Sequence, residues 1–173
     1  SHTLFRRTVD LTAVPETATI EITASSVYRL YVNGALVLTG PARGTVHYMF
    51  VDTIHVGRFV CQGENTVAVE VIYFPDLIPA VLQHEYPDLP PGVAIGGTLV
   101  ALDDSWRSTV LSCYDPDAFW ARGQKGEQIH VAGYPDGWML PGFDDSRWHP
   151  VGDTEVAPAE LRRVEVPGLS APA

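Results

Sequence analysis

The sequence predicts an all-β fold, a β-sandwich of the jelly-roll type. Three observations lead to this prediction. Several short segments rich in β-branched residues alternate between apolar and polar side chains, an Asn-Gly pair separates two of them, and turn residues recur at short intervals. The chain has 173 residues, of which 46% are hydrophobic and 18% charged, which suits one domain with a two-layer core. We expect a single jelly-roll module over residues 1–156.

The first part of the chain contains the clearest strand patterns. Residues 17–23 (T-A-T-I-E-I-T) and 65–74 (N-T-V-A-V-E-V-I-Y-F) have period-two alternation and many β-branched residues, so we expect a strand in each. A further strand is expected over residues 47–56. The Gly and Asn of residues 62–65 indicate a tight connection before the strand that follows.

A β-hairpin is expected around Asn33 and Gly34. The apolar runs 27–32 (V-Y-R-L-Y-V) and 35–38 (A-L-V-L) flank this pair. Asn-Gly tolerates the positive φ angles that a type I′ turn requires at both central positions, and this turn matches the twist of paired strands. The sequence therefore predicts two antiparallel neighbours joined by a two-residue turn.

Two segments are rich in proline. In residues 75–91, proline removes backbone donors often enough to exclude a regular central strand, so we expect a long surface loop. Such a loop either forms the wall of a binding cleft or covers an exposed sheet edge. Residues 157–173 have the composition of a linker, in which residues 161–166 have the character of an additional edge strand.

Strand patterns resume after the first of these segments. Residues 93–102, 106–111 and 127–131 are each expected to form a strand, with turns rich in Gly, Asp and Pro between them. Many short strands separated by turns are typical of a sandwich or jelly roll.

Charge and composition exclude several classes of partner. The chain carries 21 acidic against 11 basic residues, a formal net charge of −10, which repels phosphate backbones and anionic membranes. No apolar run approaches the ~20 residues that span a bilayer, and the N-terminus lacks a signal-peptide pattern. We therefore expect a soluble protein, with the cytoplasm and secretion both open. Cys61 and Cys113 fit no zinc-ligand spacing, and either a disulfide or two separate thiols agrees with the sequence.

Two related motifs, D-D-S-W at residues 103–106 and F-D-D-S-R-W at 143–148, predict a recurrent turn. Asp followed by Ser hydrogen-bonds its own backbone in an Asx-type turn, and the Trp that follows begins a strand and enters the core. A structural role therefore explains both motifs. Trp106 and Trp148 are accordingly expected in the core.

The order of several motifs resembles the N-terminal accessory domains of bacterial α-L-rhamnosidases. The segments that carry the resemblance are residues 5–11 (F-R-R-T-V-D-L), 30–34 (L-Y-V-N-G), 63–69 (G-E-N-T-V-A-V), 103–106 (D-D-S-W), 126–131 (G-E-Q-I-H-V) and 137–148 (G-W-M-L-P-G-F-D-D-S-R-W). The resemblance implies a galactose-binding-like jelly roll that flanks an (α/α)₆ catalytic barrel and that in some members binds L-rhamnose with calcium. The chain departs from the family pattern in two segments. Residues 44–48 lack its Trp, and Ile129 (or His130) and Ala132 stand where the pattern has Asp and Arg.

The sequence contains no catalytic constellation. A glycosidase needs two carboxylates on opposite sides of the scissile bond. The adjacent pairs Asp103-Asp104 and Asp144-Asp145 lie in turn motifs, and neighbouring residues of a strand point to opposite faces. The histidines are scattered, and no G-x-S-x-G motif is present. We therefore expect a non-catalytic carbohydrate-binding or substrate-positioning module attached to the catalytic domain of a glycoside hydrolase.

Sugar binding requires an aromatic ring to stack on a pyranose and polar groups to bind its hydroxyls. Residues 114–138 combine both, and Trp120 and Trp138 lie in loop-like sequence where partial exposure is plausible. The candidate sugar-binding residues are Trp120, Trp138, Tyr134, Asp136 and Arg122. A competing location is the loop at 75–91, with Tyr73, His84 and Tyr86.

Calcium is the one cofactor that the sequence leaves open, beside the commoner role of Asp as a solvated turn residue. It binds about six to eight oxygen ligands, which acidic loops supply without a fixed spacing. The candidate ligands are Asp115, Asp117, Asp136, Asp144 and Asp145. Two other functions stay open: a scaffold domain that packs on a catalytic barrel and binds no sugar, and a fragment that contributes one loop to a composite active site.

Overall fold

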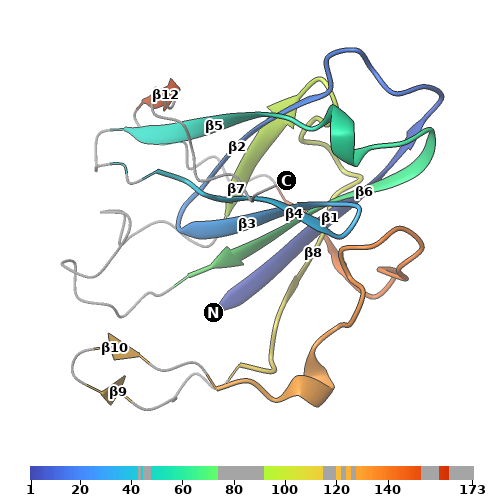
Figure 1. The fold of residues 1–173 in the computed structure, drawn as a ribbon. Helices are drawn as coiled ribbons and strands as arrows, with labels where there is room; N and C mark the ends of the chain where they lie inside the picture. Colours follow the sequence, from blue (N-terminus) through green and yellow to red (C-terminus); the bar gives the residue numbers. More distant parts are fainter. Residues whose placement is uncertain are drawn as a thin grey trace.

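The computed structural model describes residues 1–42, 44, 48–73, 92–114, 120–121, 124–125, 128–152 and 160–163, which form two main β-sheets (Figure 1). The larger sheet contains, in spatial order, β11 (His149–Pro150), β8 (Arg107–Val110), β1 (His2–Leu11), β6 (Gly63–Ile72), β3 (Val27–Val32) and β4 (Ala35–Gly40). The smaller sheet contains β12 (Leu161–Arg163), β5 (Met49–His55), β2 (Thr19–Ala24) and β7 (Val93–Gly97). A separate pair joins β9 (Trp120–Ala121) to β10 (Gln124–Lys125), and two short 3₁₀ helices are η1 (Gly57–Phe59) and η2 (Val131–Gly133).

The main hydrophobic core lies between the two sheets. Phe5, Val69 and Leu30 are register partners on β1, β6 and β3, and all three are buried in it. From the smaller sheet, Ile20 and Ile22 alternate with a more exposed Glu21, as period two requires. Burying each such side chain contributes about 1.5–3 kcal/mol. The predicted β-sandwich is confirmed.

The predicted hairpin is also confirmed. Asn33 and Gly34 connect β3 to β4 with φ angles of 50° and 83°, both in the region that a type I′ turn needs. The amide of Asn33 donates to Asn65 Oδ1 at 2.8 Å and to the carbonyl of Phe59 at 2.9 Å. The turn is thereby tied to the neighbouring loop as well as to its own strands.

The central strand β6 begins earlier than expected, at Gly63. The tight connection predicted over residues 62–65 therefore lies partly within the strand. The reason is Asn65, whose side chain accepts from the amide of Cys61 at 2.9 Å and donates to the carbonyls of Cys61 and Gly63 at 2.8 Å. These bonds close the loop from within the strand.

The later strands are shorter than the patterns indicated. β7 ends at Gly97, β8 covers most of residues 106–111, and both lie within the expected segments. The strand expected at 127–131 is wrong, because Ile129 makes only an isolated bridge to Tyr114 and η2 begins at Val131. The loop expected at 75–91 lies outside the described residues.

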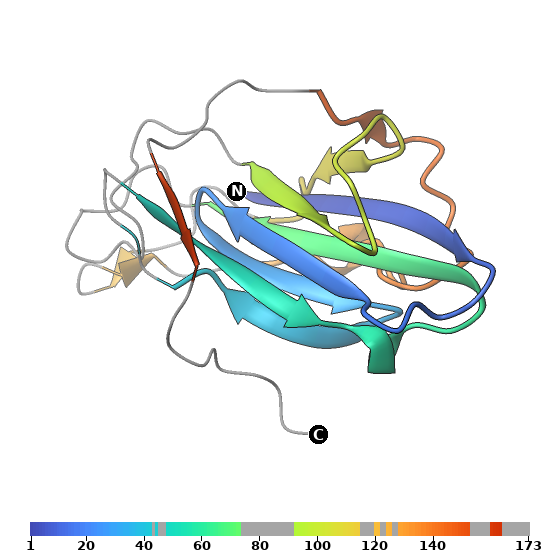
Figure 2. The ribbon, with the colours of Figure 1, turned by 90° about the horizontal axis from the view of Figure 1, so that it is seen from above.

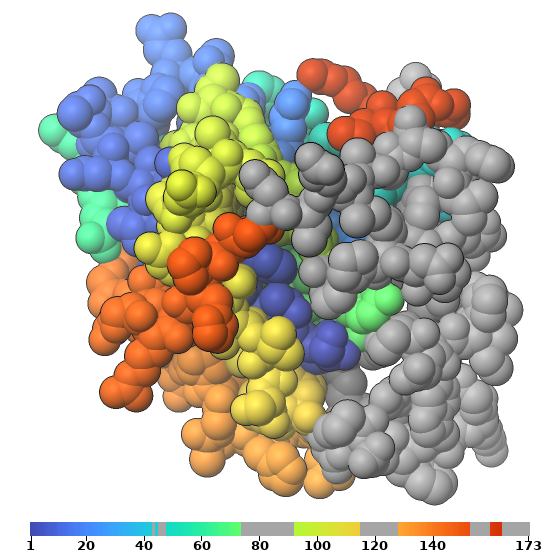
Figure 3. Space-filling view, turned by 180° about the vertical axis from the view of Figure 1, so that it is seen from behind, coloured from blue at the N-terminus to red at the C-terminus, as the bar shows by residue number. Residues whose placement is uncertain are grey.

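The C-terminal strands join opposite sheets. β12 lies parallel to β5 at the edge of the smaller sheet, seen as red beside teal in Figure 2, so the first part of the additional edge strand is confirmed. β11 pairs with β8, and residues 92–114 and 128–152 lie side by side on the face shown in Figure 3.

Two simple features of the described chain complete the fold. Both cysteines are free thiols, with Cys61 exposed and Cys113 buried. Among the described residues, no helix is long and apolar enough to cross a membrane.

Candidate functional site

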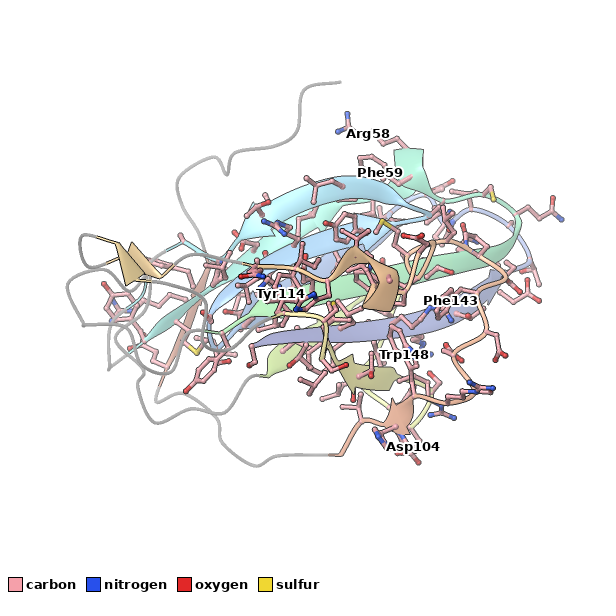
Figure 4. The ribbon with its side chains drawn as sticks, turned by 90° about the horizontal axis from the view of Figure 1, so that it is seen from below. Arg58, Phe59, Asp104, Tyr114, Phe143 and Trp148 are labelled. Carbon is pink, nitrogen blue, oxygen red and sulfur yellow. The ribbon has the colours of Figure 1, made fainter. Side chains whose placement is uncertain are left out.

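The outer face of the six-stranded sheet is covered by a second, smaller core. Here "outer face" means the face that looks away from the four-stranded sheet. Leu4 and Ala68 of the sheet are buried against Trp138, together with Leu111 and Cys113. We call residues 128–148, which contain Trp138, the covering segment. Figure 4 shows its Phe143 and Trp148 toward one end of this face and Tyr114 toward the other. The larger sheet is therefore packed on both of its faces, a condition that favours near-continuous apolar strands such as β6.

Arg6 fixes the covering segment to the sheet. This guanidinium is only 1% exposed and lies at 5.3 Å from the ring centroid of Phe143. Its nitrogens donate to the carbonyls of Trp138 (3.0 Å), Phe143 (3.1 Å) and Leu140 (3.2 Å), to the hydroxyl of Thr66 (3.4 Å) and to the carboxylate of Asp145. All three nitrogens of the guanidinium, Nε, Nη1 and Nη2, thus donate hydrogen bonds, and these bonds offset the cost of burying the charge.

Both D-D-S motifs form the predicted Asx-type turns. The amide of Ser105 donates to Asp103 Oδ1 at 3.0 Å, and the amide of Ser146 donates to Asp144 Oδ1 at 3.0 Å. The serine hydroxyl of each turn, followed by its backbone amide, holds the pKa of Asp103 and of Asp144 below the usual range. Trp106 follows the first turn into the main core as predicted, whereas Trp148 after the second turn is only half-buried and packs against the outer core beside Phe143.

A buried carboxylate, Glu70, lies in the middle of the outer face. It is 2% exposed and is paired with His2 at 2.8 Å and with Arg29 at 3.0 Å. Burial would raise the pKa of Glu70, but the hydrogen bond to His2 and the charge of Arg29 outweigh burial and lower it overall. The His2 ring stacks on Tyr114 with 3.5 Å between centroids. Glu70 is therefore held as a carboxylate.

Beside this carboxylate lies a group that we call the tyrosine surface, formed by Arg29, Tyr31 and Tyr134. Arg29 and Tyr31 are two positions apart on β3 and so share the outer face. The Tyr31 ring meets the Trp138 ring edge-on at 5.7 Å, and the indole Nε1 of Trp138 donates to the Tyr134 hydroxyl at 3.0 Å. Trp138 thus contacts both tyrosines.

The structure gives the predicted sugar-binding residues different positions. The sequence left partial exposure of Trp138 plausible, but the residue is fully buried, so its ring is closed to a sugar. The reason is that it fills the outer core above Leu4 and Ala68. Tyr134 is half-buried next to it, and Asp136 is exposed. Trp120 belongs to β9 by its backbone, its side chain lies outside the description, and Arg122, His84 and Tyr86 lie outside the described residues.

The predicted calcium ligands do not converge within the described residues. Asp144 accepts from Ser146, Asp145 pairs with Arg6, and Asp136 is exposed. In the part of the chain that the structure describes, no three His, Cys, Asp or Glu side chains gather into a group able to hold a metal ion. Asp115 and Asp117 lie outside the described residues. Calcium binding stays a prediction.

Sequence reasoning missed Arg29, Tyr31 and Glu70. A signal for the last was present, because an acidic residue interrupts the run V-A-V-E-V-I of a strand that is otherwise apolar on both faces. A buried carboxylate needs partners, and Arg29 is its register partner on β3. The cross-strand pairing that joins the two residues was absent from the sequence pattern.

Comparison with solved structures finds this architecture within larger chains. A family GH78 rhamnosidase of Bacillus sp. GL1 matches with a TM-score of 0.78 and 30% identity, over 96% of this chain and 18% of that one. The chain is similar to a domain-sized part of α-L-rhamnosidases. The α-L-rhamnosidase of Dictyoglomus thermophilum matches with a TM-score of 0.71, 21% identity and coverage of 94% and 19%.

A third rhamnosidase-like match is the Streptomyces avermitilis α-L-rhamnosidase complexed with L-rhamnose. It has a TM-score of 0.54 and 27% identity, over 87% of this chain and 12% of that one. No family model and no curated protein matches the chain. The chain thus spans less than a fifth of the rhamnosidases that it resembles. The resemblance predicted from the motif order is confirmed, and it concerns a small part of a larger enzyme.

Proposed function

We propose that this chain is a non-catalytic accessory module of a rhamnosidase-like glycoside hydrolase and that it binds or positions carbohydrate. The observation that carries the proposal is the match to the Bacillus rhamnosidase, which covers 96% of this chain but 18% of that enzyme. A module of this size leaves most of the larger chain to supply the chemistry. Its own contribution is then contact with the substrate or with the catalytic domain.

The positions of the described carboxylates support a non-catalytic role. Hydrolysis of a glycoside needs one carboxylic acid and one carboxylate facing each other across a sugar. Asp103 and Asp145 are paired with Arg7 and Arg6, and Glu70 is buried with its partners. These groups are engaged in holding turns and layers together.

The sugar that we expect is L-rhamnose or a related monosaccharide. Isothermal titration of the purified chain with L-rhamnose and a panel of other monosaccharides tests this, with each titration run in calcium and repeated in chelator. Saturable heat with at least one sugar supports carbohydrate binding, and its loss in chelator would assign a metal to the site. Absence of heat with every sugar in both conditions would contradict the proposal.

A scaffold role is the second candidate, and exposed apolar side chains in the covering segment favour it. Ile129, Val131 and Leu140 are 39%, 70% and 47% exposed. Apolar side chains left in water are typical of surfaces that contact another domain. The test is binding of the separately expressed catalytic domain of the parent chain, measured by titration against this module. A complex that Val131→Ser and Leu140→Ser weaken, together with no sugar binding, would favour the scaffold.

A further inference from the structure

We propose that the tyrosine surface of Arg29, Tyr31 and Tyr134 is a binding site for a neutral sugar. The proposal rests on the carbohydrate-binding function proposed above and deepens it by naming the place and the contacts. The site lies on the outer face of the six-stranded sheet, where β3 meets the segment that contains Trp138. It keeps Tyr134 from the site expected from the sequence and adds Arg29 and Tyr31, while the buried ring of Trp138 is no longer a contact for the sugar.

The two phenols have hydrogen-bonding capacity to offer a ligand. Within the described part of the chain, no group pairs with the Tyr31 hydroxyl, and that oxygen is absent from the buried polar atoms without partners. The Tyr134 hydroxyl accepts from Trp138, so its own hydrogen is left for another acceptor. A phenol both donates and accepts, as a sugar hydroxyl does. Because both tyrosines contact the same indole, that of Trp138, they suit a ligand that carries more than one hydroxyl.

The phenols stay protonated over the physiological range. Burial raises the pKa of Tyr31, and the nearby charges of Glu70 and Tyr134 raise it further. Burial likewise raises the pKa of Tyr134. Both groups are thus neutral hydrogen-bond donors at neutral pH.

The rings are held in place before any ligand arrives. Trp138 is fully buried and contacts both tyrosines, and its carbonyl is held by Arg6. A ring fixed by packing loses little conformational entropy when a ligand binds. The half-buried Tyr31 ring also provides an apolar surface against which the C–H face of a pyranose packs.

Arg29 lies at the edge of the site and carries its positive charge. Its side chain is 41% exposed while one nitrogen is anchored on Glu70 at 3.0 Å. Because the Glu70 carboxylate balances this charge and the chain has a net charge of −10, the surface favours an uncharged sugar over a uronic acid or a sugar phosphate. Glu70 acts here as a positioning residue for Arg29.

The test is titration of the Tyr31→Phe chain with the monosaccharide that binds the unmodified chain most tightly, starting with L-rhamnose. This substitution removes one hydroxyl and no hydrogen bond within the described structure, so the fold is preserved. Loss of one hydrogen bond to the ligand is expected to weaken affinity roughly 5-fold. Tyr31→Ala, which also removes the ring, is expected to weaken affinity by more than about 10-fold.

The matched control is Tyr48→Phe, a half-buried tyrosine that lies in contact with Arg162 away from the outer face. It is expected to bind like the unmodified chain. If Tyr31→Phe and Tyr31→Ala both bind sugar as tightly as the control, the sugar lies elsewhere and the proposed site is wrong, while the carbohydrate-binding function stands. If the unmodified chain binds no sugar, both proposals fail together.

Discussion

At the scale of single residues, Arg6 is the charged group on which the outer layer depends most. Its guanidinium is bonded to three backbone carbonyls, one hydroxyl and one carboxylate that come from two distant parts of the chain. Removing one member of a buried ion pair typically costs about 3–5 kcal/mol, because the remaining groups lose their partners. We therefore expect Arg6→Ala to lower the free energy of unfolding by about 3–5 kcal/mol in urea denaturation.

The neighbouring residue Arg7 provides a matched control for this substitution. It lies on the same strand, but its ion pair with Asp103 is 18% and 44% exposed on the two sides. Pairs that water screens contribute about 0–1 kcal/mol. Loss of this ion pair in Arg7→Ala is therefore expected to lower the free energy of unfolding by less than about 1 kcal/mol. The substitution also removes the hydrogen bond from Arg7 to the carbonyl of Ala101. Equal effects of the two substitutions would mean that Arg6 does not hold the covering segment.

Arg6 and Arg7 also show how far residue roles are predictable from sequence. Both stand in F-R-R, and alternation predicts only that they point to opposite faces. Which face carries a second layer depends on where residues 128–148 return to the sheet. That return is a long-range contact, so the burial of Arg6 and of Trp138 was outside the reach of local patterns.

At the scale of elements, the pairing of β2 with β7 depends on a close approach of the two backbones at Gly97. This residue has φ of +122°, and a Cβ there would lie 2.4 Å from the carbonyl oxygen of Thr19. Strained backbone of this kind costs about 1–3 kcal/mol for a residue with a side chain. We expect Gly97→Ala to lower the free energy of unfolding by at least about 2 kcal/mol, measured in urea.

Gly96 is the control for this element. It precedes Gly97 in the same strand, and a Cβ built on it meets nothing within 4 Å. Gly96→Ala is expected to change stability by less than about 0.5 kcal/mol. An equal loss of stability in the two variants would show that general strand propensity, and not the contact with Thr19, makes glycine necessary in β7.

Elements were predictable where the local signal and the final packing agree. The Asn33-Gly34 hairpin and the strands β2, β5 and β6 followed from alternation and turn chemistry. The segment at Ile129 has the same apolar alternation, yet its described residues, 128–131, make a single bridge, from Ile129 to Tyr114, and Ile129 is 39% exposed. Alternating apolar residues indicate that a segment can bury one of its faces. The segment becomes a strand only where the edge of another strand is available to pair with it.

At the scale of the whole molecule, each of the two cores contains a buried carboxyl group, and the pKa values of these two groups are shifted in opposite directions. In the outer core, the pKa of Glu70 lies below its usual value of about 4.3. Glu70 therefore contributes stability that is present above that value and lost as pH falls through its folded pKa. Glu70→Gln is expected to cost about 1–3 kcal/mol at pH ~7 and much less at pH ~3, measured by urea denaturation. A cost that is the same at both values would contradict the ionised pair.

In the main core, the pKa of Asp52 is shifted in the opposite direction. Tyr28 donates to it at 2.5 Å, but burial dominates and raises the pKa of Asp52, which is 7% exposed. A raised folded pKa favours the protonated form, so the contribution of Asp52 to stability falls as pH rises from about 3.9 through the folded pKa.

Asp52→Asn separates this charge from the hydrogen bond, because the amide oxygen still accepts from Tyr28. We expect the free energy of unfolding of Asp52→Asn, relative to the unmodified chain, to rise between pH ~3 and pH ~7 as the buried charge is avoided. Tyr28→Phe is the complementary change: it leaves the carboxylate without this donor and is expected to cost about 1–3 kcal/mol at pH ~7. A relative stability of Asp52→Asn that falls between the two pH values would mean that the charged form of Asp52 is the one that the sandwich stabilises.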